Sequence, residues 1–177
     1  MFRRPLWLRR AATIALLAIT LANPAVAQAP AAAALPENVL SYFAGTWDIV
    51  ATTPGSSDVT SYVYEVRPWV QPNWLSGHGR SVPAGEESRD VWGRDGASGE
   101  LMRIIFADNG TYAVVRSSGW QGNRLVLEGD ARSAGGVVRV RETIERLGDN
   151  QFLATWEAYR EGSWSPYSVE RVTRRGG

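Results

Sequence analysis

The sequence predicts an all-β fold, an antiparallel up-and-down barrel of about ten strands preceded by a short helix. From residue 46 onward, short runs rich in Val, Ile, Tyr, Trp and Thr alternate with turn clusters every 8–14 residues or so, a pattern typical of sandwiches and barrels. Because the loops are short, neighbouring runs are expected to pair as antiparallel hairpins. Ten hairpin-linked strands would leave two long exposed edges unless the sheet closes, and closure predicts a barrel.

The first 27 residues have the pattern of a cleavable secretory signal peptide. An uncharged apolar stretch over residues 11–22 is too short to span a bilayer, which needs about 20 residues. Ala25-x-Ala27 supplies a small-residue cleavage site after this stretch. Four positive residues precede it: Arg3, Arg4, Arg9 and Arg10. We therefore expect residues 1–27 to be removed and the protein to be periplasmic or secreted.

Cleavage changes the charge of the chain. The full sequence has 19 Lys and Arg residues against 18 Asp and Glu residues, and loss of four arginines leaves 15 against 18, or about −3. A mildly acidic protein has no general electrostatic attraction to nucleic acid or to anionic membranes. The sequence has no cysteine that could carry a lipid, so we expect no membrane anchor after cleavage and no nucleic-acid partner.

The mature chain divides into a linker and one domain. Residues 28–35 form an Ala-rich low-complexity linker that is expected to be disordered, and residues 36–177 form the barrel domain. The short helix is predicted over Pro36–Ala44, with Pro36 at its start and Gly45 after its end. The strands are predicted over 46–53, 59–68, 73–82, 87–94, 100–107, 111–118, 123–132, 137–147, 151–160 and 163–174.

The last four predicted strands can be placed in register, with turns over 133–136, 148–150 and 160–163. A two-residue turn at 149–150 is rejected because it would mismatch the apolar faces. The resulting inner-face pairs are Leu125 with Ile144, Leu127 with Glu142, Glu142 with Trp156, Val140 with Ala158, Ile144 with Ala154, Trp156 with Tyr167, Ala154 with Val169, and Phe152 with Arg171.

This register points the carboxylate of Glu142 into the barrel. A buried carboxylate must be paired, hydrogen-bonded or protonated. Glu142 is either a cavity residue that binds a polar group of a ligand or half of a structural ion pair. In the second case its partner is an inward arginine, for which the candidates are Arg80, Arg103, Arg116 and Arg171.

The segment Gly45-Thr46-Trp47-Asp48 resembles the Gly-x-Trp opening of lipocalin-like (calycin) barrels. The resemblance implies that Trp47 closes the barrel floor under an arginine of the last strand, and the predicted register makes Arg171 that arginine. The ten-strand count is similar to that of nitrobindin-like and fatty-acid-binding barrels. Short motifs such as Trp74-Leu75-x-Gly77 also resemble exported bacterial lipocalin-like domains of unknown function.

The sequence departs from the nitrobindin-like pattern at the haem ligand. That family holds haem through a histidine near the C-terminus, whereas the single histidine here is His78, in the third predicted strand. We therefore expect no haem and no other cofactor. One histidine without cysteines cannot build a usual zinc site, so no metal is expected.

Two pairs of residues allow both a functional and a structural interpretation. His78 and Arg80 share one face of their strand and either bind an anionic group or lie on an exposed face. Trp156 and Tyr167 either line a ligand cavity or pack in the core.

The leading functional hypothesis is an exported barrel that binds a small apolar or amphipathic molecule in its interior. One alternative is an enzyme on the same barrel with Glu142 or His78 as acid–base catalyst, although no Gly-x-Ser-x-Gly elbow or cysteine nucleophile supports catalysis. The other is a non-catalytic surface-interaction module with a solid core. The expected ligand-binding residues are Glu142, Trp156, Tyr167, Leu127, His78 and Arg80, and the expected floor residues are Trp47 and Arg171.

Overall fold

The computed structural model describes residues 39–70 and 73–176. The predicted signal peptide and linker lie outside these residues. The eleven strands of the described part are β1 (Gly45–Thr52), β2 (Val59–Pro68), β3 (Trp74–Val82), β4 (Glu87–Arg94), β5 (Leu101–Ala107), β6 (Tyr112–Ser117), β7 (Trp120–Gln121), β8 (Arg124–Ser133), β9 (Gly136–Gly148), β10 (Gln151–Arg160) and β11 (Ser163–Arg174). This part contains no helix long and apolar enough to cross a membrane.

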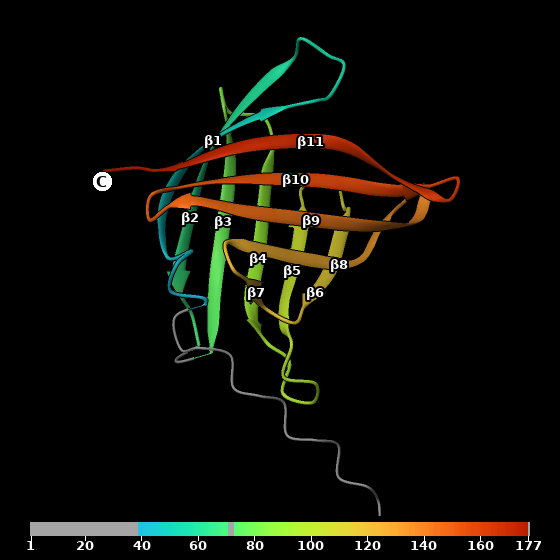
Figure 1. The fold of residues 1–177 in the computed structure, drawn as a ribbon. Coiled ribbons are helices and arrows are strands. Elements are labelled where there is room, and N and C mark those ends of the chain that lie inside the picture. Colours follow the sequence, from blue (N-terminus) through green and yellow to red (C-terminus); the bar gives the residue numbers. More distant parts are fainter. Residues whose placement is uncertain (1–38, 71–72, 177) are drawn as a thin grey trace, which may run out of the picture. The chain divides into compact units, whose positions relative to one another are not determined.

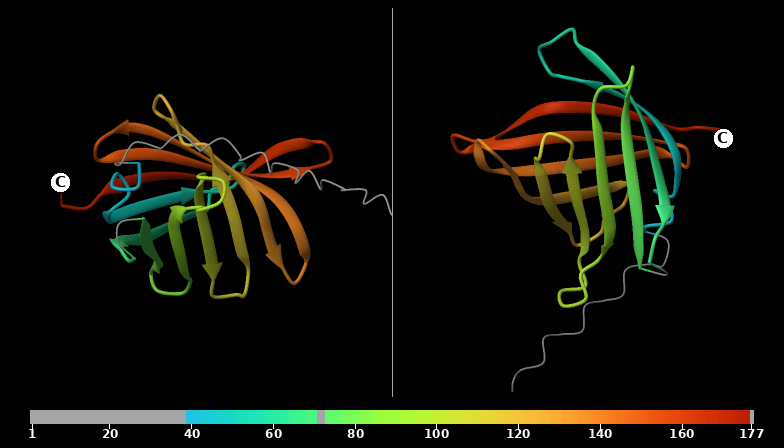
Figure 2. Two further views of the ribbon diagram at one scale, coloured as in Figure 1. Left: turned by 90° about the horizontal axis from the view of Figure 1, so that it is seen from below. Right: turned by 180° about the vertical axis from the view of Figure 1, so that it is seen from behind.

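Ten of these strands close into an antiparallel barrel. Successive strands pair along the chain, β1 also pairs with β11, and β6 pairs with β8 to complete the ring. In Figure 1, β9 to β11 cross in front of β3 to β6 at a steep angle, and Figure 2 shows the same crossing from below and behind. Closure pairs the edges that an open sheet would expose.

The ten predicted strands are all present, within one residue at each end. The difference is the two-residue strand β7, which lies where the sequence indicated only a turn, over residues 119–122. Trp120 and Gln121 pair with Leu125 and Arg124 at the start of β8. Both β6 and β7 therefore pair with β8, one after the other, and Ser118 and Gly119 separate them.

The register predicted for β8, β9 and β10 is confirmed for the inner face. Leu127 lies opposite Glu142, and Glu142 lies opposite Trp156. The turn between β9 and β10 was predicted wrongly. Gln151 pairs with Gly148 across a two-residue turn, and a bulge at Leu147 then restores the expected register.

The register predicted between β10 and β11 is wrong beyond the middle of the strands. Glu157 pairs with Pro166, but Trp156 pairs with Ser168, so Tyr167 is an extra residue in a β-bulge. A one-residue slip moves every following side chain to the other face. Val172 rather than Arg171 is therefore opposite Phe152, and Arg171 is exposed on the outside.

The residues before β1 plug one end of the barrel. The predicted helix is not confirmed: Phe43 and Ala44 donate backbone hydrogen bonds to Leu40 and Ser41, which makes turns, and residues 36–38 lie outside the described residues. The ring of Phe43 stacks on that of Trp92 with centroids 4.6 Å apart.

Trp47 lies at this plugged end, and its arginine is Arg174 rather than the predicted Arg171. Trp47 is fully buried, and its indole N–H donates to the carbonyl of Phe43 at 2.8 Å. The guanidinium of Arg174 lies 4.0 Å from the Trp47 ring and donates to the carbonyls of Ala44 (2.5 Å) and Tyr42 (2.7 Å). Arg174 thus ties the end of the chain to the segment before β1.

Large apolar side chains fill the half of the barrel next to this plug. They come from the ends of strands that meet there, and all are at most 5% exposed: Phe43, Trp47, Val66, Trp92, Leu101, Val115, Leu125, Leu127, Ile144, Phe152 and Val172. This half is a solid core, so space for a ligand must lie in the other half.

We predict that Arg174→Ala destabilises the protein by about 2–4 kcal/mol, because two carbonyls lose a charged donor and Trp47 loses its cation. Arg171→Ala is the matched control, since it removes an exposed arginine three residues away and should change stability by no more than about 0.5 kcal/mol. Urea unfolding of both variants measures the difference, and equal effects would contradict this account of the floor.

Candidate functional site

Arg103 lies at the centre of the barrel, above the solid core. Its Nη1 is 2.7 Å from both carboxylate oxygens of Glu142 on β9, and its Nε donates to Oδ2 of Asp90 on β4 at 2.7 Å. Both acidic side chains are 3% exposed. Of the four arginines expected as partners for Glu142, Arg103 is the one that the structure selects.

Aromatic side chains complete this cluster. The hydroxyl of Tyr64 donates to Oδ2 of Asp90 at 2.6 Å, and the indole N–H of Trp92 donates to the Tyr64 hydroxyl at 2.8 Å. The guanidinium carbon of Arg103 lies 4.4 Å from the Trp92 ring centroid, in cation–π contact. Trp92, Tyr64, Asp90, Arg103 and Glu142 therefore form one continuous network, which we call the Arg103 cluster.

Gly77 on β3 makes room for the Arg103 cluster. A Cβ atom at this position would lie 1.7 Å from Oδ1 of Asp90 and 2.5 Å from the Tyr64 hydroxyl. A glycine inside a strand often marks a place where other groups approach the backbone closely.

The Arg103 cluster contains two carboxyl groups and one guanidinium. Burial raises the pKa of Glu142, although the neighbouring Arg103 opposes that rise. Burial tends to lower the pKa of Arg103, but Glu142 and Asp90 together hold it well above its ordinary value. Arg103 thus stays charged and is shared by two carboxylates.

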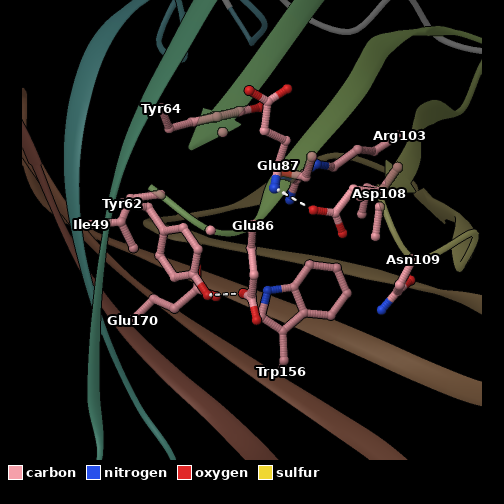
Figure 3. A pocket seen from close by; sticks show the side chains of 15 residues that line it. Ile49, Tyr62, Tyr64, Glu86, Glu87, Arg103, Asp108, Asn109, Trp156 and Glu170 are labelled. Atoms are coloured by element: carbon pink, nitrogen blue, oxygen red, sulfur yellow. Dashed lines mark hydrogen bonds between the residues drawn. The ribbon is translucent and has the colours of Figure 1, made fainter. Parts of the chain in front are cut away.

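A cavity of about 470 Å³ lies above the Arg103 cluster, in the half of the barrel that the core leaves unfilled. Figure 3 shows the side chains of Trp156, Glu170 and Tyr62 near one another in its wall, with Arg103 on another side. The lining residues are Ile49, Tyr62, Tyr64, Gly79, Gly85, Glu86, Glu87, Ser88, Arg103, Ile105, Ala107, Asp108, Asn109, Trp156 and Glu170.

A smaller cavity of about 270 Å³ adjoins the first. Some residues, such as Val140 and Tyr167, line only the smaller cavity, whereas Ile105, Trp156 and Glu170 line both cavities. The shared residues show that the two cavities are neighbours, and we call them the two lobes of the candidate site.

Glu170 is an ionisable cavity residue that the sequence patterns did not reveal. The bulge at Tyr167 turns Glu170 inward, where it lies opposite Ala51 on β1 and Ala154 on β10. Burial, reinforced by the charge of Glu142, raises the pKa of Glu170 to about 7, against weaker opposing effects of Arg103 and Ser168. Pro166 is the signal that could have revealed the bulge, since proline inside a sheet is confined to edges and bulges.

The structure separates the residues that the sequence grouped as a ligand site. Trp156 lines both cavities, and Tyr167, although 44% exposed, lines the smaller one. Leu127 belongs to the solid core, and Glu142 contacts Arg103 and does not line either cavity.

His78 and Arg80 lie on the outer face of β3, which is the alternative to anion binding that the sequence left open. The inner positions of this strand are the buried residues Leu75, Gly77, Gly79 and Ser81, which alternate with the outer ones. The Nε2 of His78 is 3.5 Å from Oε2 of Glu87, and Arg80 is exposed. Among the residues that the structure describes, no group of three or more potential ligand side chains could hold a metal ion.

Neither a protein-family model nor a curated protein sequence matches the chain. The chain is similar in fold to designed proteins of known structure. A redesigned β-barrel is 12% identical, with a TM-score of 0.41 over 81% of this chain and 99% of that chain. A second redesigned β-barrel, bound to DFHBI, is 12% identical, with a TM-score of 0.42 over 78% and 100%. A de novo designed fluorescence-activating β-barrel is 13% identical, with a TM-score of 0.44 over 80% and 100%.

At these identities the likeness concerns the fold alone. The closed ten-strand antiparallel barrel itself is established by the pairing of its strands.

We predict that Arg103→Met destabilises the protein by about 3–5 kcal/mol at neutral pH, because Asp90 and Glu142 are left buried without a cation. The loss should shrink as the pH falls, since unpaired buried carboxylates have raised pKa values and become neutral. Arg139→Met, which breaks an exposed pair with Glu128, is the control and should cost at most about 1 kcal/mol. Denaturant unfolding at several pH values tests this; equal losses for the two variants would contradict it.

Proposed function

We propose that this protein binds a small apolar or amphipathic molecule in the cavity above the Arg103 cluster. The observation that carries the proposal is the division of the barrel into a solid half and a hollow half of about 470 Å³, with an adjoining lobe of about 270 Å³. Pockets for small molecules commonly measure about 300–1,000 Å³.

The chemistry of the lining supports an amphipathic occupant. Ile49, Ile105 and Trp156 supply an apolar surface, while Tyr62 and Glu170 supply polar atoms at defined places. Such a mixture of apolar walls and a few oriented polar groups is usual for ligand pockets.

The geometry favours ligand binding over catalysis by Glu142 or His78, the two residues that the sequence suggested as acid–base catalysts. Both oxygens of Glu142 contact Arg103, and Glu142 does not line the cavity. His78 lies on the outer face of β3. In this proposal Glu142 acts by holding Arg103 in place.

We also infer that the chain is a lipocalin-like (calycin) barrel. The support is the end of the barrel, where Trp47 is buried under a last-strand arginine, as the Gly-x-Trp resemblance implies, with Arg174 in that role. A structure of a closely related chain without this Trp–Arg contact would argue against the assignment.

Export remains a proposal that rests on the N-terminal sequence pattern. We expect the protein to be recovered outside the cytoplasm without residues 1–27, so that the mature chain begins at Gln28. The intact mass of the protein in the periplasmic fraction measures this. A full-length mass, or recovery from the cytoplasm alone, would overturn it.

We predict that Ile105→Trp weakens the binding of an uncharged apolar dye such as N-phenylnaphthylamine by about tenfold or more, because the larger ring occupies both lobes of the cavity. The neighbouring Ile104→Trp points to the outer face of β5 and is the matched control. Dye fluorescence titrations of the two variants and the wild type measure the effect. No dye binding by the wild type, or equal binding by both variants, would contradict the proposed site.

A further inference from the structure

The cavity has more carboxylates than positive charge to match them. This observation bears on which ligand binds, and the inference from it therefore rests on the proposed function. Among the described residues that line the cavity, one is basic, Arg103, and it is shared by the buried Asp90 and Glu142. Four lining residues are acidic, but the carboxylate of Glu87 lies beside His78 on the outer face, which leaves those of Glu86, Asp108 and Glu170.

The tyrosine hydroxyls of the wall already donate to carboxylates. Tyr62 donates to Glu86 at 3.0 Å, and Tyr64 donates to Asp90 at 2.6 Å. The hydrogen bond that Glu170 accepts from Ser168 is long, at 3.4 Å. The cavity thus offers hydrogen-bond acceptors, namely carboxylate oxygens, to a bound molecule. A ligand with hydrogen-bond donors and a positive charge would complement this lining.

Glu170 lies where it can contact both parts of an amphipathic molecule. Its cross-strand neighbours, Ala51 and Ala154, are small and uncharged. Trp156 and Ile105 line the same two lobes as Glu170. The face of an indole ring also attracts cations, so Trp156 adds to the attraction for a positively charged group.

We propose that the ligand is an amphipathic amine whose protonated nitrogen contacts Glu170 and whose apolar part packs against Trp156 and Ile105. An anionic amphiphile of the same shape is disfavoured, because it would meet Glu170 while the one lining cation, Arg103, is already shared by Asp90 and Glu142.

The pH dependence of binding follows from the groups around Glu170. Those groups are Arg103 on β5, Glu142 on β9, Tyr62 on β2 and Tyr167 on β11; Ala51 and Ala154 carry no charge. Glu170, with a pKa of about 7, loses its proton as the pH rises through neutrality, and the ionised form attracts an ammonium group. Amine binding should therefore tighten between about pH 6 and pH 8, whereas binding of an uncharged analogue should not change.

The test uses three probes with one ring system: naphthylmethylamine, naphthylmethanol and naphthoic acid. Isothermal titration calorimetry of the purified exported chain at pH 8 should show the amine binding about tenfold or more tightly than the alcohol, and the acid binding weakest. Glu170→Gln should reduce amine affinity to that of the alcohol and abolish the pH dependence. Glu145→Gln is the charge-matched control, because Glu145 is exposed on the outer face of β9.

The outcomes separate this inference from the proposed function. Alcohol binding that is equal in the wild type and Glu170→Gln shows that the variant is folded and that the cavity accepts ligands. If the alcohol binds but the amine has no advantage, or if Glu170→Gln keeps that advantage, the amine proposal is wrong and the cavity remains a ligand site. If none of the three probes binds the wild type, the proposed function itself is wrong.

Discussion

The interior of this barrel depends on one cation shared by two buried carboxylates. Removing an arginine and two carboxylates from water is costly, and their mutual attraction offsets that cost only with close geometry and further hydrogen bonds. Arg103 meets this requirement through contacts of 2.6–2.7 Å to Asp90 and Glu142, and Tyr64 adds a donor to Asp90. Gly77 leaves the space that these groups occupy.

The Arg103 cluster also separates the two halves of the barrel. On one side, aromatic and aliphatic side chains pack without room for a ligand, and Phe43 and Trp47 cover the end. On the other side, small residues such as Ala107 and Gly79 line the wall, and the interior is hollow. A polar layer between the two keeps its charged groups in fixed positions at the base of the cavity.

Sequence patterns predicted the strands well because alternating burial and turn chemistry are local properties. They also placed Glu142 correctly between Leu127 and Trp156, since the apolar faces of β8 to β10 must agree. Alternation along β5 puts Arg103 on the same face as the buried Leu101, which favours it over the outward-facing Arg80 and Arg116.

The parts that were missed depend on long-range packing or on a bulge. Asp90 and Tyr64 look like ordinary strand residues until the closed barrel brings them together around Arg103. The volume of the cavity depends on how side chains from all strands meet, which no local pattern encodes. Glu170 was overlooked, and the floor role of Arg174 was given to Arg171, because the register of β11 was extended through Pro166 and Tyr167 without a bulge.

That bulge also constrains how the sequence can change during evolution. Loss of Tyr167 itself would remove the bulge but keep Ser168 opposite Trp156 and Glu170 opposite Ala154, so the rest of β11 would keep its faces. A residue inserted between Ser168 and Arg174 without a second bulge would instead shift the end of β11 by one position and turn Arg174 away from Trp47. A single insertion in this part of β11 would thus disturb the barrel floor, whereas loss of Tyr167 or a length change in the exposed turn at Glu161 and Gly162 is tolerated more easily.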